Sequence, residues 1–215
     1  MTTALVERSQ LGAPADTQDL TVEDRAAAAL LTCVARTGWS KTTFDDVARE
    51  AGCSRATLYR YFAGKPALLE TTLTGELGRV EAELVDATAQ AATLEDALVA
   101  IVGTGTRIVR DHHALGFLLA NESEVILPHL AFSGGDRVLT TAGRVIAGAL
   151  APFLPEGADA ARAGEWVARS TFVYVFATAA PFDLATEADA RALVREFLLP
   201  SLSQSPVLTL DPVRE

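Results

Sequence analysis

Residues 42–65, TTFDDVAREAGCSRATLYRYFAGK, carry the pattern that decides the fold: two short helices joined by a turn that centres on a glycine. Thr43 precedes the first helix and Asp46 follows three residues later, which makes a capping box with Asp in place of Glu. Gly52 permits the left-handed backbone of a sharp turn, and Ser54 is the expected N-cap of the second helix. This order of elements predicts a helix-turn-helix unit that reads DNA.

The second helix carries side chains that suit a DNA surface. Leu58 and Phe62 lie four residues apart and share the buried face, so the other face presents Arg55, Ala56, Thr57, Tyr59, Arg60 and Tyr61. Arginine can donate two hydrogen bonds to guanine, alanine can contact a thymine methyl, and hydroxyls can bind phosphates or base edges. The alternative is that the tyrosines only pack and the arginines form a solvated face. The capped helix and glycine turn beside them favour DNA binding.

The segment 38–69, GWSKTTFDDVAREAGCSRATLYRYFAGKPALL, resembles the DNA-binding domain of the TetR family of bacterial transcriptional regulators. It matches the family's glycine, aromatic, Thr-Thr, Val-Ala, Ala-Gly, Thr-Leu-Tyr, aromatic-Phe and Lys positions in order and without a gap. Tyr61 stands where His is most common, and Cys53 stands where Val is usual.

The resemblance implies a role for each matching position. Arg55, Ala56 and Tyr59 would face bases, whereas Thr43, Thr57, Arg60, Tyr61 and Lys65 would meet the sugar-phosphate backbone. Lys65 also opens the next helix, whose amino-terminal amides favour a phosphate oxygen. With Ser54, these residues make up the predicted DNA interface.

Charge is divided unevenly along the chain. The protein of 215 residues has a net charge of −10, but residues 41–65 carry five cationic and three acidic side chains, a local charge of +2. A positive DNA-binding end can approach a duplex while the acidic remainder limits non-specific binding. At 49% hydrophobic residues, the chain can bury a sizeable core and is expected to form two modules.

The rest of the chain shows helical patterns and no strand pattern, which predicts an all-α protein. The expected helices cover about 22–37, 65–89, 93–110, 114–125, 136–150, 158–179 and 186–202, with Phe132 at the tip of a loop over 128–135. The predicted organisation is a disordered arm (1–20), the DNA-binding domain (21–66), a larger ligand-binding and dimerisation domain (67–203) and a loose tail (204–215).

The sequence gives less information about the site that would bind a small-molecule effector. Gly103 and Gly105 cost a helix roughly 0.8–1.0 kcal/mol each, which suggests a kink or close approach of a ligand. Trp39 is expected to be a core residue rather than part of a ligand site. Candidate ligand-binding residues are Thr104, Phe117, Asn121, Glu124, Trp166, Ser170 and Tyr174, although aromatics at helical spacing are usually core and such Glu residues usually surface. The expected effector is a small apolar or amphipathic molecule, with a lactone, an acyl chain or an aromatic compound as candidates.

The helix expected over 158–179 is apolar nearly all round in its second half, so it needs two packing partners. The resemblance implies that the last two helices of each chain pair as a four-helix dimer interface. The predicted interface residues are Val173, Ala177, Ala188, Ala192, Leu193 and Phe197. Two DNA-binding domains related by a two-fold axis would read a palindrome.

Several other functions are not supported by the sequence. It has no nucleophile elbow, phosphate-cradling loop or paired acid and base, so we expect neither an enzyme nor a cofactor. Three His residues lack metal-ligand spacing, and Cys33 and Cys53 suit buried free thiols. The absence of a signal peptide or of about 20 consecutive apolar residues predicts a cytoplasmic protein without a membrane partner.

These observations predict a homodimeric transcriptional regulator, a repressor that binds a palindromic double-stranded DNA operator and leaves it when the effector binds. The alternative is a DNA-binding regulator without a small-molecule effector, which is controlled by a protein partner or acts constitutively.

Overall fold

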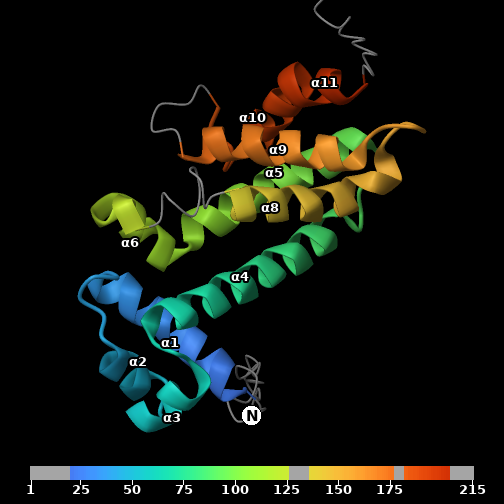
Figure 1. Ribbon diagram of the computed structural model, residues 1–215. Coiled ribbons are helices and arrows are strands. Elements are labelled where there is room, and N and C mark those ends of the chain that lie inside the picture. Colours follow the sequence, from blue (N-terminus) through green and yellow to red (C-terminus); the bar gives the residue numbers. More distant parts are fainter. Residues whose placement is uncertain (1–19, 126–135, 177–181, 204–215) are drawn as a thin grey trace, which may run out of the picture.

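The computed structural model describes residues 20–125, 136–176 and 182–203, and every regular element in these ranges is a helix (Figure 1). Helices α1 (Val22–Thr37), α2 (Phe44–Glu50) and α3 (Arg55–Tyr61) form a three-helix unit at one end of the molecule. From this unit α4 (Lys65–Thr88) runs obliquely to the body at the other end. The all-α prediction is confirmed.

The body consists of further helices stacked beyond α4. Figure 1 shows α8 and α9 beside α5, with α6 to one side and the last helices across the top. The elements are α5 (Leu94–Asp111), α6 (His113–Asn121), α8 (Asp136–Leu150), the short 3-10 turn η1 (Ala151–Phe153), α9 (Ala160–Phe176), α10 (Glu187–Leu193), the π-helical turn η2 (Val194–Leu198) and α11 (Leu199–Ser203).

Two sequence expectations on the body are corrected. The helix expected over 186–202 contains the π-helical turn η2, and the one expected over 114–125 ends at Asn121. The predicted loop around Phe132, the end of the helix expected to reach residue 179, and the predicted arm and tail apart from Leu20 lie outside the described residues.

Side-chain caps set the helix starts in the three-helix unit. Thr21 with Asp24, and Thr43 with Asp46, both form complete capping boxes. The Ser54 side chain accepts a hydrogen bond from the Thr57 amide at 3.0 Å and starts α3. Gly52, at φ 66°, makes the turn between α2 and α3.

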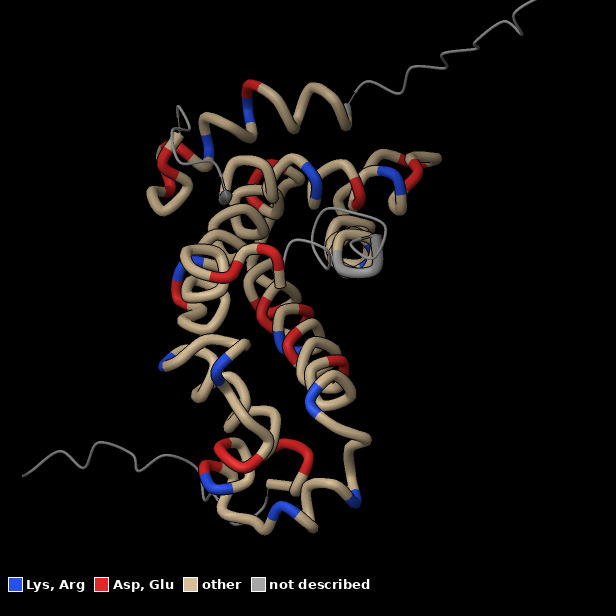
Figure 2. Tube along the Cα trace, turned by 60° about the vertical axis from the view of Figure 1, so that its left-hand side comes forward, with Lys and Arg blue, Asp and Glu red and all other residues tan. Residues whose placement is uncertain are grey.

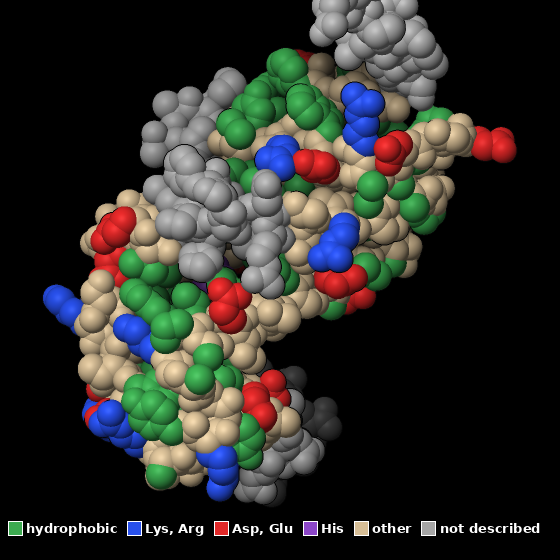
Figure 3. Space-filling view, viewed as in Figure 1, with side chains coloured by type: hydrophobic (Ala, Val, Ile, Leu, Met, Phe, Trp, Pro, Cys, Tyr) green, Lys and Arg blue, Asp and Glu red, His purple; other side chains and the backbone are tan. Residues whose placement is uncertain are grey.

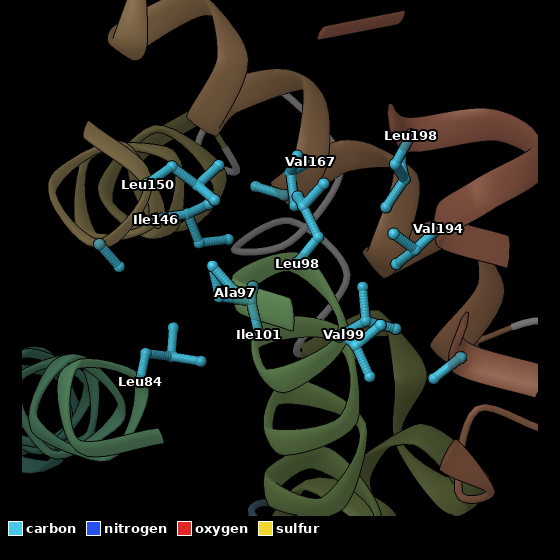
Figure 4. Packing of buried hydrophobic residues seen from close by; sticks show 14 of the residues in the cluster. Leu84, Ala97, Leu98, Val99, Ile101, Ile146, Leu150, Val167, Val194 and Leu198 are labelled. Carbon is cyan, nitrogen blue, oxygen red and sulfur yellow. The ribbon is translucent and has the colours of Figure 1, made fainter. Parts of the chain in front are cut away.

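Buried apolar residues form two clusters, and α4 contributes to both. The cluster of the three-helix unit includes Leu30, Leu58 and Leu68, together with Ala114 and Leu118 from α6. The body cluster joins α4, α5, α8, α9 and η2 (Figure 4); its members include Leu84, Leu98, Ile101, Ile146, Leu150, Val167 and Val194. Because α4 and α6 pack against the three-helix unit, a change in the body can reach that unit through these two helices.

Helices α8 and α9 pack unusually close together. A Cβ atom built on Gly164 would lie 2.8 Å from the Ala147 Cα and would overlap the Gly143 carbonyl oxygen. A Cβ on Gly143 would lie 3.0 Å from the Glu165 Cα. The two glycines therefore permit a backbone approach that no larger residue allows.

Within the described ranges, no helix is both long enough and apolar enough to cross a membrane.

Candidate DNA interface and effector cavity

Helix α3 presents the predicted DNA-reading side chains to solvent. Leu58 and Phe62 are buried, while Tyr59 and Tyr61 are 49% and 42% exposed. Arg55, Ala56 and Arg60 are also exposed, and Thr57 is half-buried. In Figure 2, Lys and Arg positions of the three-helix unit lie along its outer edge. This placement agrees with the orientation that the sequence predicts for α3, and contact with DNA remains a prediction.

Arg55 is held in place from two sides. Its Nη1 lies 3.1 Å from Asp45 Oδ2 on α2, and its guanidinium carbon lies 5.4 Å from the centroid of the Tyr59 ring. The Tyr59 ring in turn lies 4.7 Å from the buried Phe44 ring. The side chain that the sequence assigns to base contact is thus braced by an aromatic stack rooted in the core of the unit.

Two hydroxyls of the predicted DNA interface, those of Thr43 and Ser54, also cap helices. Thr43 donates its hydroxyl hydrogen to Asp46 Oδ2 at 2.6 Å, so it has no second hydrogen to give to a phosphate unless this bond exchanges. The Thr57 hydroxyl lies 2.9 Å from the Ser54 hydroxyl. The Arg60 guanidinium carbon lies 5.4 Å from the Tyr61 ring centroid, and both side chains are exposed.

Lys65 has a structural role that the sequence did not reveal. Its Nζ donates to the Trp39 carbonyl at 2.6 Å and to the Thr42 carbonyl at 2.9 Å, and lies 4.1 Å from the Trp39 ring centroid. Burial lowers the pKa of this ammonium group, and the Glu122 carboxylate opposes that effect. Lys65 was predicted as a phosphate ligand; two of its three N–H donors instead tie α4 to the α1–α2 turn.

Glu122, just past α6, binds the same turn. Its carboxylate accepts hydrogen bonds from the Trp39 amide at 2.6 Å and from the Ser40 amide at 3.2 Å. Gly38, at φ 84°, lets this contact form, because a Cβ there would lie 2.7 Å from Phe117 Cε1 and 2.8 Å from Glu122 Oε1. The end of α6 is therefore latched onto the three-helix unit.

Three predicted ligand residues lie at or near this latch, and none of them lines the apolar cavity described below. Phe117 packs against Gly38 rather than lining a cavity. Asn121 is exposed, and its Nδ2 donates to the Phe117 carbonyl at 3.0 Å. Glu124 is exposed. Trp39 and Glu122 are more than 80 positions apart in the sequence. Local sequence patterns therefore could not indicate that Glu122 is the carboxylate that binds the α1–α2 turn.

An apolar cavity of about 260 Å³ lies between α1, α4, α5, α6, α8 and α9. Its wall combines residues of the three-helix unit with residues of the body. Members from the three-helix unit and its connections include Leu30, Leu31, Val34, Trp39 and Leu69, and members from the body include Leu77, Gly105, Ile108, Leu115, Ile146, Ala168, Thr171, Phe172 and Val175. Trp39, expected only as core, is half-buried and lines this cavity, and so does Gly105, which the sequence had marked.

The remaining predicted ligand residues do not line this cavity. Thr104 lies in a separate groove with Arg107 and Arg191. Trp166 is 50% exposed and donates from Nε1 to the Ser201 hydroxyl at 3.0 Å, and the Tyr174 ring packs edge-on against Phe182. Ser170 is half-buried and is not part of the cavity wall.

For the three predicted residues on α9, the rotation of the helix explains why they do not line this cavity. Ala168, Thr171, Phe172 and Val175, which share one helical face, line the cavity. The residues predicted from the sequence to bind the ligand, Trp166, Ser170 and Tyr174, lie on the neighbouring face of α9. Since α9 is apolar on nearly every side, its sequence period does not show which face points inward.

Polar groups at one side of the cavity are paired with one another. His112 Nε2 lies 3.3 Å from Glu76 Oε2, and Nδ1 of the same ring accepts the Leu115 amide at 3.1 Å. Because Nδ1 accepts, the ring proton is on Nε2 and faces the carboxylate. The hydrogen bond from His112 lowers the pKa of Glu76 while burial opposes it, and Arg79 lowers it further. An outer groove lined by Arg36, Arg79 and Arg107 also reaches Glu76 and His112, so this pair separates the groove from the cavity.

Some of the residues predicted to form the dimer interface are exposed on the surface of the body, and others are buried. Trp166, Val173 and Phe197 are large apolar side chains that are 50%, 65% and 51% exposed. Figure 3 shows hydrophobic side chains gathered at this end of the molecule, over α10 and α11. Ala188 is exposed and Ala192 half-buried, whereas Leu193 is 1% exposed and belongs to the core of its own chain, so its interface assignment is wrong. Ala177 lies outside the described residues.

Over the described ranges, no group of three or more His, Cys, Asp or Glu side chains is placed to hold a metal ion. Cys33 is a buried free thiol and Cys53 a half-buried one.

A helix-turn-helix unit with an exposed, cation-bearing second helix, joined to a helical body across an apolar cavity, is typical of DNA-binding transcriptional regulators. Residues 26–72 match the family model of bacterial regulatory proteins, tetR family. An uncharacterized HTH-type transcriptional regulator of Mycobacterium tuberculosis is 30% identical over 156 residues, which cover 73% of each chain. The chain belongs to the TetR family and is a transcriptional regulator, not an enzyme.

Solved structures share its fold. The TetR family repressor AlkX from Dietzia sp., implicated in biodegradation of n-alkanes, aligns with a TM-score of 0.62 at 19% identity and covers 90% of this chain and 100% of its own. FadR from Bacillus subtilis, in complex with stearoyl-CoA, has a TM-score of 0.56 at 18% identity and covers 83% and 97%. QsdR from R. erythropolis, a transcriptional repressor, has a TM-score of 0.56 at 20% identity and covers 86% and 97%.

Proposed function

We propose that this regulator is a homodimeric repressor that leaves a palindromic operator when an apolar or amphipathic small molecule occupies the cavity between α1, α4, α5, α6, α8 and α9. The observation that carries the proposal is the shared wall of this cavity. Leu30 and Val34 of α1 and Trp39 of the following turn line it together with body residues. A molecule in the cavity therefore touches the DNA-binding unit directly.

Trp39 supplies the step from cavity to DNA-binding unit. Its ring lines the cavity, its amide is held by Glu122, and its carbonyl is held by Lys65 at the start of α4. A ligand that displaces the ring strains both hydrogen bonds, and so favours a different placement of the turn that leads into α2. The ligand shifts the equilibrium only by its preference for that second placement.

The chemistry of the cavity sets the class of effector. Its wall is almost wholly apolar, which suits a hydrocarbon chain or ring. AlkX is implicated in n-alkane biodegradation and FadR was solved in complex with stearoyl-CoA, so two proteins of this fold are linked to molecules with hydrocarbon chains. An acyl chain, an aromatic compound or a lactone fits this description.

Dimerisation is supported by the exposed apolar face of Trp166, Val173 and Phe197. Contiguous apolar surface of this kind marks association sites. A two-fold dimer would place two α3 helices in successive major grooves about one helical turn apart.

The proposal is tested by a screen in two steps. An operator is first selected from random DNA, and its affinity is measured by fluorescence anisotropy. Compounds that raise the melting temperature of the protein are then added to the operator complex. Release of DNA by such compounds is the expected result, whereas tighter DNA binding would indicate a co-repressor or an activator.

The alternative hypothesis, a regulator without a small-molecule effector, predicts a different outcome of this screen. No compound from an apolar and amphipathic set would raise the melting temperature, native mass spectrometry would show no bound molecule, and operator affinity would stay constant.

A further inference from the structure

Thr171 on α9 carries a buried hydroxyl without a partner. The residue is 8% exposed and lines the cavity, and its Oγ1 has no hydrogen-bond partner in the described part of the chain. Hydroxyls of helical threonines commonly bond the carbonyl one turn earlier, as Thr72 does to Leu68 at 2.8 Å and Thr106 to Val102 at 2.7 Å. An unsatisfied buried hydroxyl costs free energy, so this exception marks a place where a ligand completes the structure.

The second threonine and the two titratable side chains of the wall already have partners. The Thr72 hydroxyl is bound to its own helix. Glu76 faces His112 and Arg79, and the second nitrogen of His112 accepts the Leu115 amide. Among the described lining residues, Thr171 is thus the one whose polar side-chain atom is fully buried and has no partner.

The charges around the cavity act against an ionised ligand. No lysine or arginine belongs to its wall as described, and the one charged group there is the acidic Glu76. A carboxylate or phosphate held inside this cavity would be buried without a counter-ion, because Glu76 is acidic and already paired, and that burial costs far more than a hydrogen bond returns. A cationic ligand is also disfavoured, because His112 and Arg79 already occupy the Glu76 carboxylate and separate it from the ligand.

We infer that the effector is an uncharged molecule with a single hydrogen-bonding oxygen, such as a ketone, ester or lactone, which accepts the Thr171 hydroxyl hydrogen while its apolar part fills the cavity. This inference rests on the proposed function in that it concerns the same cavity. It narrows the candidates to neutral carbonyl compounds and excludes free fatty acids.

Two nine-carbon probes test the charge, 2-nonanone as the neutral carbonyl and nonanoate as the anion. Their affinities are measured by isothermal titration calorimetry on the full-length protein. Wild type should bind 2-nonanone at least about tenfold more tightly than nonanoate, because the anion loses its solvation.

Three variants test the hydroxyl. Thr171→Val keeps the shape and removes the hydroxyl, and should weaken 2-nonanone about 3- to 10-fold. Thr171→Ser keeps the hydroxyl and should retain most of the affinity. Thr106→Val, at a buried threonine outside the cavity wall whose hydroxyl is already bonded to the Val102 carbonyl, should leave 2-nonanone affinity nearly unchanged.

The ligand-free protein gives a second readout that does not depend on any probe. Replacing an unsatisfied buried hydroxyl by a methyl group should raise the melting temperature of Thr171→Val by roughly 2–4 °C, whereas Thr106→Val, which removes a bonded hydroxyl, should not raise it. A melting temperature lowered by Thr171→Val would show that the hydroxyl is satisfied in the free protein and would overturn the inference.

The inference is also overturned if nonanoate binds as tightly as 2-nonanone, if Thr171→Val binds the ketone as wild type does, or if neither probe binds. The proposed function fails separately. If 2-nonanone binds in a way that depends on Thr171 but leaves operator affinity unchanged, effector-driven release is refuted. The same result would support the inference that the carbonyl oxygen of the ligand binds the Thr171 hydroxyl.

Discussion

At the scale of single residues, Arg55 is the side chain best placed to read a base. It is exposed near the start of α3 and is braced by Asp45 and Tyr59. Arg55→Ala should cost ~1–3 kcal/mol of operator binding per half-site and relax the preference at one base pair, with non-specific affinity nearly unchanged. Anisotropy titrations on operator and random DNA measure both quantities.

Arg107→Ala is the matched control, since it removes an exposed arginine that pairs with Glu83 on α4, away from α3. It should leave operator binding intact. Equal losses on operator and random DNA in Arg55→Ala would move Arg55 to the phosphate-contacting group.

Lys65 combines a structural role, which the structure shows, with the phosphate contact that remains a prediction. Lys65→Met keeps the aliphatic stem but leaves the Trp39 and Thr42 carbonyls without their donor, so it should destabilise the protein by about 1–3 kcal/mol. If its third N–H meets a phosphate, the salt dependence of DNA binding should also fall by about one unit per half-site. Urea unfolding and titrations at several salt concentrations separate the two effects, because a lower stability with an unchanged salt slope would leave only the structural role.

What the sequence could predict at this scale was local. The Thr43–Asp46 capping box and the outward face of α3 depend on residues three or four positions apart, and the structure confirms them. The contacts that join Trp39 to Lys65 and Glu122 span 26 and 83 positions. Such contacts depend on how helices pack, which no local pattern in one sequence specifies.

At the scale of elements, the α6 latch is one of the contacts that join the body to the three-helix unit. Glu122→Ala leaves the Trp39 and Ser40 amides without their acceptor, and should cost about 1–3 kcal/mol of stability. It should also reduce the change in operator affinity that an effector causes, since α6 no longer follows Trp39. Thermal unfolding and operator titrations with and without effector measure these effects.

Glu124→Ala provides the control, because this neighbouring carboxylate is exposed. Wild-type stability and wild-type coupling are expected for it. Should Glu122→Ala behave in the same way, the latch would have no part in signalling.

Glycines inside helices should respond differently to substitution by alanine, depending on whether a second helix packs against them. Gly164→Ala would push a methyl group into the backbone of α8 near Gly143 and Ala147, and should destabilise the protein by about 1–3 kcal/mol. Gly103→Ala meets nothing within 4 Å in the middle of α5 and should stabilise it by about 0.5–1 kcal/mol. Chemical denaturation of both variants checks the signs, and a stable Gly164→Ala would mean that the two helices are further apart.

The sequence singled out Gly103 and Gly105 because glycine is costly inside a helix, yet it gave no reason to choose Gly164. All three occupy helix interiors, and only the packing of a second helix distinguishes them. The same limit explains α9, whose existence was predictable from its apolar content but whose inward face was not.

At the scale of the whole molecule, α4 connects two separate apolar clusters. Leu68 lies in the cluster of the three-helix unit and Leu84 in that of the body. The cavity lies between the two clusters, with Thr72, Leu73 and Leu77 of α4 on its wall. A ligand there is positioned to alter the angle between the DNA-binding unit and the body, and in a dimer this angle sets the spacing of the two α3 helices.

The final prediction concerns assembly. Phe197 is 51% exposed on η2, and its ring packs edge-on against Phe182 with a centroid separation of 6.1 Å. If this face joins two chains, Phe197→Asp buries an unpaired carboxylate at their contact and should yield monomers. Val85→Asp tests whether any charge on an exposed apolar site has this effect, since Val85 is 51% exposed on α4, away from that face.

Light scattering with a parallel operator titration decides the outcome. A folded Phe197→Asp monomer should keep only weak, salt-sensitive DNA binding, because it forfeits the second half-site, whereas Val85→Asp should remain a tight-binding dimer. Circular dichroism confirms that each variant is folded. A Phe197→Asp protein that stays dimeric and binds the operator tightly would place the interface on another surface, and Trp166 and Val173 would then need a different partner.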